Sequence, residues 1–204
     1  MNKIITTSIL ILLFSTFGKS QVAVSEIDRF THLKQLENGI LLVQLPNRDK
    51  KIVKLKEMGA TKRAKKEAQE IKLIREGIFE GFNENFDFCN TLYFEREHTK
   101  EILNGNYKNV FDEKKELVTD FPKVNQVYVA QYGVGHPMGE VYSYNGVGIQ
   151  IRHISNGELR TLNHDYFYKR SKLGLIMGIK KAVIKGIKNL NYKLKKVAVK
   201  DETN

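Results

Sequence analysis

The sequence predicts an α+β protein in which one long helix packs on a mixed or mainly antiparallel sheet. Three observations indicate this class: short apolar runs with strand periodicity, one long charged helical segment between the first two of them, and a second helical pattern near the end of the chain. Hydrophobic residues make up 41% and charged residues 28% of the 204 residues. This composition excludes a wholly disordered chain and suits a single folded domain.

The first twenty residues have the pattern of a cleavable secretory signal peptide. Lys3 supplies a positive charge, Ile4 to Phe17 is largely apolar, and small residues then precede Gln21. This run is short for a span of about 30 Å of hydrocarbon, and no later run is apolar enough to cross a membrane. We therefore expect an exported protein that is periplasmic, associated with the cell envelope, or secreted to the exterior. An uncleaved membrane anchor is the alternative.

The first half of the mature chain predicts a strand, a long helix and a second strand. Residues 21–37 show no clear periodicity and are expected to begin as a loose arm. Residues 40–45 form a short apolar run typical of a buried strand. Residues 49–82 carry apolar side chains at helical spacing, with Gly59 as a point where the helix can bend or split. Residues 87–95 predict the next strand.

The second half predicts a short helix and then a meander of strands. Residues 97–103 end at an Asn-Gly pair, and residues 106–124 are irregular. Alternating side chains indicate strands over 126–132 and 147–154. The pair Asn156-Gly157 is typical of a hairpin turn. The remaining strand candidates of the meander are residues 159–162 and residues 166–168.

Two stretches carry a likeness to other proteins. They are Leu36-Glu37-Asn38-Gly39-Ile40-Leu41-Leu42-Val43, and Asn85-Phe86-Asp87-Phe88-Cys89 leading into Leu92-Tyr93-Phe94, with the charged helix between them. In this pattern the chain resembles a group of uncharacterised exported proteins of Bacteroidota, over about residues 33–154. The resemblance implies an architecture and a compartment, and it implies no activity.

Net positive charge collects at the end of the chain. Residues 169–200 contain 11 basic residues and no acidic one, whereas residues 21–168 contain 21 of each. We therefore divide the chain into a signal peptide (1–20), an α+β domain (21–168) and a basic amphipathic helical tail (169–204). The apolar side chains of the tail fall within an arc of about 80° at 100° per residue. The predicted surface-binding residues lie on its other side: Lys181, Lys185, Lys188, Lys195 and Lys196.

The apolar stripe of this tail needs a surface to cover it, because an isolated helix of this kind is marginally stable. One surface is the protein's own sheet, which would leave the lysines in solvent. A second is an anionic membrane surface, which a basic amphipathic helix suits. A third is a groove on a protein partner. We do not expect nucleic acid, since the sequence has no nucleic-acid-binding motif.

Catalytic and metal-binding patterns are weak in this sequence. The glycine-rich segment 133–146 joins two strands and contains His136 and Glu140, which with His153 are the candidates for an acid–base pair or metal ligands. The more ordinary interpretation is a solvated connection. Cys89 is the only cysteine, so an intrachain disulfide is excluded and a buried, unreactive thiol is expected, with an intermolecular disulfide as the alternative.

These features favour a non-enzymatic binding or accessory module of the cell envelope, without a cofactor or a metal. The alternative is a hydrolase or metal-dependent enzyme that uses the loop with His136 and Glu140.

Overall fold

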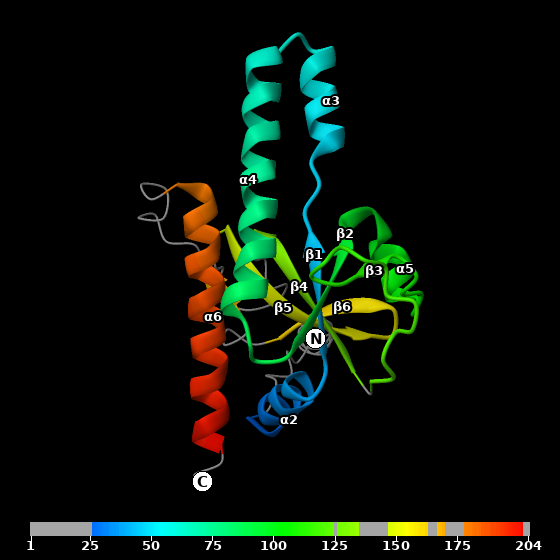
Figure 1. Cartoon of the computed structure of the whole chain (residues 1–204), viewed down its shortest axis with the longest axis vertical. Helices are drawn as coiled ribbons and strands as arrows, with labels where there is room; N and C mark the ends of the chain where they lie inside the picture. Colours follow the sequence, from blue (N-terminus) through cyan, green and yellow to red (C-terminus); the bar gives the residue numbers. More distant parts are fainter. Residues whose placement is uncertain (1–25, 125, 135–146, 163–166, 170–177, 202–204) are drawn as a thin grey trace, which may run out of the picture.

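The computed structural model describes residues 26–124, 126–134, 147–162, 167–169 and 178–201. Its strands form one seven-stranded sheet in the order β3-β2-β1-β4-β5-β6, with β7 beside β5 (Figure 1). The α+β class is confirmed. The strands are β1 (Ile40–Leu45), β2 (Asn90–Glu95), β3 (Val110–Phe111), β4 (Val127–Val134), β5 (Val147–Ser155), β6 (Glu158–Thr161) and β7 (Phe167–Lys169). The helices are α2 (Glu26–Glu37), α3 (Asp49–Glu57), α4 (Thr61–Asn85), the 3₁₀ turn η1 (Arg96–His98), α5 (Thr99–Leu103) and α6 (Ile179–Asp201).

The sheet is mixed, and β1 is the strand that carries its parallel pairings. Strand β1 pairs in parallel with β2 on one side and with β4 on the other, so that Leu42 lies beside both Leu92 and Val129. All other pairs in the sheet are antiparallel. The chain leaves β1 toward β2 and later crosses to the opposite side for β4. The carboxyl end of β1 is therefore a topological switch point, the position at which open sheets with parallel strands commonly bind ligands.

The two faces of the sheet are covered differently. We call one the helical face, because α2, α4 and α6 lie on it, and the other the open face. Because side chains alternate along a strand, Leu41, Val43, Tyr128 and Ile151 point to the helical face and join its core. A smaller core on the open face is formed by strand residues together with Ile102 of α5 and Val110 of β3.

The segment expected as one long helix is a helical hairpin. Gly59 has a φ of +70°, a conformation that favours glycine. The Ala60 amide donates to the Leu55 carbonyl, and the Gly59 amide donates to the Lys56 carbonyl. This is the Schellman pattern of a helix end. The chain therefore ends α3 at this glycine, reverses direction and starts α4.

The segment expected as a loose arm contains helix α2. Leu33 and Leu36 are 2% and 0% exposed and belong to the main core. These two residues, three apart, indicate a helix by spacing, but two positions are too few to give a recognisable periodicity against the polar residues around them.

Helix α6 packs on its own domain, which decides between the three surfaces considered for its stripe. Val183, Ile187, Leu190 and Leu194 are all at most 2% exposed and belong to the same core as the sheet. Figure 1 shows α6 beside α4 on the helical face. Among the described residues, no helix is long and apolar enough to cross a membrane.

Candidate functional site

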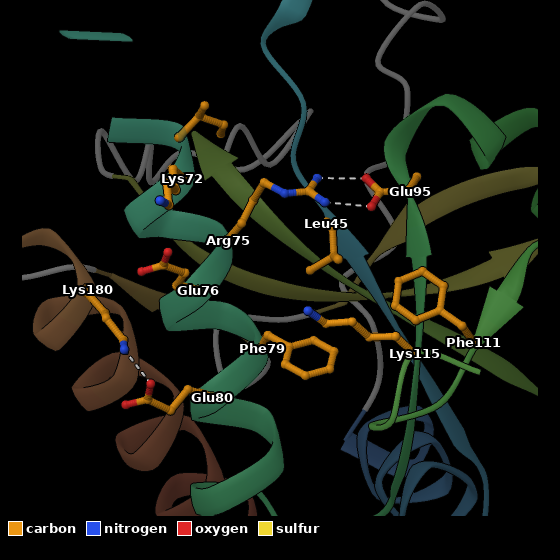
Figure 2. A pocket seen from close by; sticks show the side chains of 11 residues that line it. Leu45, Lys72, Arg75, Glu76, Phe79, Glu80, Glu95, Phe111, Lys115 and Lys180 are labelled. Atoms are coloured by element: carbon orange, nitrogen blue, oxygen red, sulfur yellow. Dashed lines mark hydrogen bonds and ion pairs between the residues drawn. The ribbon is translucent and has the colours of Figure 1, made fainter. Parts of the chain in front are cut away.

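Two hollows lie at the carboxyl end of β1, one on each face of the sheet. The larger is a groove of about 660 Å³ between α4, α6 and the ends of β1 and β2 on the helical face (Figure 2). Apolar side chains contribute much of its lining, including Leu45, Phe79 and Phe111. Its volume is in the range of small-molecule sites.

Most charges around this groove are already matched within the protein. Arg75 of α4 donates two hydrogen bonds to Glu95 at the end of β2, at 2.6 and 2.7 Å, and a third to the Pro46 carbonyl oxygen at 3.2 Å. Hydrogen bonding to Glu95 raises the pKa of Arg75. Lys180 of α6 pairs with Glu80 of α4 at 2.5 Å. These contacts join neighbouring elements across the groove, so its charges have a structural role.

The smaller hollow is a polar pocket of about 260 Å³ on the open face. Three glutamines form a row across its floor, because Gln44 of β1 lies beside Gln131 of β4, which lies beside Gln150 of β5. Gln131 Nε2 donates to Gln44 Oε1 at 3.3 Å, and Gln44 Nε2 donates to Thr99 Oγ1 at 2.8 Å. Gln44 and Gln150 are only 7% and 8% exposed. A row of buried amides in a sheet requires hydrogen-bond partners above it.

Two arginines face this pocket. Arg152 lies two residues beyond Gln150 on β5, and its Nε and Nη2 donate to Gln150 Oε1 at 3.2 and 3.0 Å. Arg96, in the turn after β2, is exposed at the rim. The described lining residues include no carboxylate, and Arg152 has no ion pair with a described residue. Desolvation lowers the pKa of Arg152, so its charge is partly buried without a matching anion.

The pocket also has unused hydrogen-bond donors and space. Within the described part of the chain, Gln150 Nε2 has no acceptor, although its side chain is more than nine-tenths buried. Gly133 of β4 borders the pocket, and a Cβ added to it would meet no atom within 4 Å. Amide and guanidinium donors that converge on an open space without a carboxylate suit an anionic oxygen ligand, namely a carboxylate or a phosphate.

Of the three candidate catalytic residues from the sequence, only His153 lies within the described residues. His136 and Glu140 lie outside the described residues. His153 pairs with Tyr128 in the sheet. On the helical face, away from the polar pocket, its ring lies against that of His32, with the ring centroids 4.6 Å apart and the planes tilted by 51°. Burial lowers the pKa of His153, and His32 and Arg160 contribute in the same direction. Among the described residues, no group of histidine, cysteine and acidic side chains could hold a metal ion.

The cysteine and the tail lysines are also placed. Cys89 is a free, partly buried thiol just before β2, and burial raises its pKa to about 12, which favours the unreactive interpretation. Lys195 of α6 pairs with Asp87 at 2.6 Å. The other four predicted surface-binding lysines are exposed and have no ion pair within the described residues; they are Lys181, Lys185, Lys188 and Lys196.

No family model matches the chain, and no curated protein or solved structure was found to be similar to it. The assignment of the polar pocket therefore depends on its own geometry. One signal for this pocket is visible in the sequence, because Gln44 is a polar residue in the otherwise apolar run 40–45. The partners of Gln44 could not be identified from sequence, because they come from strands 87 and 106 residues later in the chain.

Proposed function

We propose that this protein is an exported, non-enzymatic binding module of the cell envelope, whose ligand carries a carboxylate or phosphate group that enters the polar pocket. The observation that carries this proposal is the partly buried Arg152, which faces three glutamines and no described carboxylate. Burying a charge without a partner is unfavourable. Such a group persists where binding requires it, even at a cost in stability.

The position of the pocket supports the same function. It lies at the carboxyl ends of the parallel strands β1 and β4, beside the switch point of the sheet. Sheet residues supply the floor, so the donors are held by a rigid scaffold. Arg96 at the rim adds a second cation that can contact the same anion. Among the described lining residues there is no histidine, serine, cysteine or acidic side chain to act as a nucleophile or general base, which favours binding over catalysis.

Calorimetric titration with inorganic phosphate and with succinate tests the proposal and distinguishes the two anions. We expect one of them to bind and Arg152→Gln to weaken that binding by about 10- to 100-fold, as a charge-assisted hydrogen bond is worth about 1.5–3 kcal/mol. Gly133→Leu should also abolish binding, because its side chain fills the pocket. The matched control is Arg160→Gln, which removes the same charge from an exposed position on the helical face.

Equal anion binding by the wild type, Arg152→Gln and Gly133→Leu would contradict the assignment. A wild type that binds neither phosphate nor succinate would also contradict it.

The second candidate function is a hydrolase that uses His136 and Glu140. One observation favours it: β4 leads directly from Gly133, at the pocket, into the segment that contains both residues. In that case an anionic ester would bind the arginines and be hydrolysed. Metal analysis and an esterase and phosphatase screen of the wild type against His136→Ala test this function. Equal activities and no bound metal would exclude it.

A further inference from the structure

The tip of the α3–α4 hairpin carries a local excess of positive charge. We call residues 50–66 the basic tip. This segment contains eight basic residues and one acidic residue, Glu57, whereas the rest of 21–168 contains 13 basic and 20 acidic residues. All eight basic side chains are exposed; they are Lys50, Lys51, Lys54, Lys56, Lys62, Arg63, Lys65 and Lys66. The overall neutrality of residues 21–168 therefore hides a strongly basic hairpin end.

The protein neutralises almost none of this charge. Lys51 pairs with Glu67 at 2.8 Å, and Arg48, just before the tip, contacts Glu67 and Glu70. These carboxylates lie on α4 at the base of the tip. The other seven basic side chains of the tip have no ion pair with any described residue. Clustered like charges repel one another, and contact with an anionic surface would relieve this repulsion.

Apolar side chains are exposed among these cations. Met58, at the hairpin turn, is 69% exposed and Val53 is 51% exposed. They are two of the five large hydrophobic side chains that are exposed in the described structure. Leu55 of α3 and Ala64 of α4 are buried, and the two helices contact each other. The apolar residues of the tip therefore divide into a buried and an exposed set. Cations surrounding exposed apolar side chains are typical of segments that enter a membrane interface.

The tip is also free of the rest of the fold. Figure 1 shows α3 and the first half of α4 extending beyond the sheet. Before Ile71, the only buried residue of α4 is Ala64. A hairpin closed by the Schellman turn at Gly59 can therefore approach a flat surface without rearrangement of the core.

We propose that the basic tip docks on an anionic lipid bilayer, with its lysines and arginines at the headgroup phosphates and Met58 in the interfacial layer. A bilayer fits better than nucleic acid, because phosphate contacts alone do not use exposed apolar side chains. This docking site is distinct from the polar pocket, and each can fail without the other.

Vesicle co-sedimentation tests the docking, with the chain from Gln21 onward in every sample. We expect binding to vesicles of phosphatidylglycerol and phosphatidylcholine that weakens as salt rises, and no binding to phosphatidylcholine alone. Each basic residue near an anionic surface contributes about 1 kcal/mol, or about fivefold in partitioning. The variant Lys54→Glu with Lys62→Glu should therefore bind at least about 25-fold more weakly. The matched control, Lys185→Glu with Lys188→Glu, makes the same charge change on α6 and should lose less than threefold.

A single tryptophan reports the orientation, because the chain has none. The fluorescence of Met58→Trp should shift to the blue on addition of anionic vesicles, while that of Tyr192→Trp, at an exposed position of α6, should not. Equal losses from the two charge-reversed variants, no vesicle binding, or an unshifted Met58→Trp signal would overturn the proposal. Tighter binding to a DNA duplex than to vesicles at the same salt would also overturn it.

Discussion

The close packing of α6 on α4 predicts that replacing Gly77 with alanine destabilises the protein. A Cβ at Gly77 would lie 2.9 Å from the Lys180 carbonyl oxygen and 3.1 Å from Val183 Cβ. The carbonyl belongs to the backbone of α6 and cannot rotate away. Alanine in place of glycine favours a helix by about 1 kcal/mol, whereas overpacking costs about 1–3 kcal/mol. We therefore expect Gly77→Ala to lower the free energy of unfolding by about 1 kcal/mol, and Gly77→Leu to lower it by more.

Urea unfolding followed by circular dichroism measures this free energy, with the m-value checked for constancy. Gly81→Ala is the informative comparison. Its Cβ would overlap Ile187 Cδ1, the end of a flexible side chain that can move, so its cost should be smaller. Lys65→Ala, at an exposed position of α4, should be within about 0.5 kcal/mol of the wild type. If Gly77→Ala instead stabilised the protein by about 1 kcal/mol, as in a solvent-exposed helix, the close approach of α6 would be refuted.

Three further predictions concern stability and reactivity. Arg75→Ala should lower the free energy of unfolding by about 1–2 kcal/mol, since the bidentate pair with Glu95 is charge-assisted but partly exposed. Arg75→Lys should recover only part of this free energy in the same urea assay, and full recovery would count against the bidentate role. In the folded state the pKa of His153 is lowered from its usual value of 6.5. As the pH falls below about 6.5, the imidazole is therefore protonated in the unfolded chain before it is protonated in the folded protein. The free energy of unfolding then falls by at most about 1.4 kcal/mol per pH unit. His153→Gln should show a shallower pH dependence in thermal melts, and an unchanged slope would contradict this origin. Because burial raises the pKa of Cys89 to about 12, maleimide should label it at pH 7.5 only in denaturant, and rapid labelling of the native protein would exclude the unreactive state.

Local patterns were sufficient to predict much of this fold. The alternation over 126–132 correctly separated Val127 and Val129 from Tyr128 and Ala130, because one residue per face is a property of the strand itself. The hairpin at Asn156-Gly157 is confirmed, with φ of +52° and +74° at its two residues. The helical stripe of the tail was also correct, because its repeat continues over several turns.

The features that sequence could not give depend on distant residues. Parallel pairing of β1 with both β2 and β4 leaves no local mark on the sequence. The sequence predicted a break in the helix at Gly59 but not a reversal of the chain, because glycine is compatible with both a bend and a full hairpin turn. The polar pocket combines β1, β4 and β5 with the turn after β2, so its glutamines look like ordinary strand residues until the register aligns them. The charge total concealed the basic tip, since acidic residues elsewhere in 21–168 cancel it.

The proposed function requires that Arg152 is kept in the fold for an external anion. Thermal melting with and without the anion that binds in calorimetry tests this directly. Without the anion, Arg152→Gln should be at least as stable as the wild type, because it removes a partly buried charge. At an anion concentration about 100 times its dissociation constant, the wild type should gain about 2.7 kcal/mol, or about 5 to 10 °C in Tm, and the variant almost nothing. A variant that melts well below the wild type without anion, or that gains as much from it, would contradict the claim.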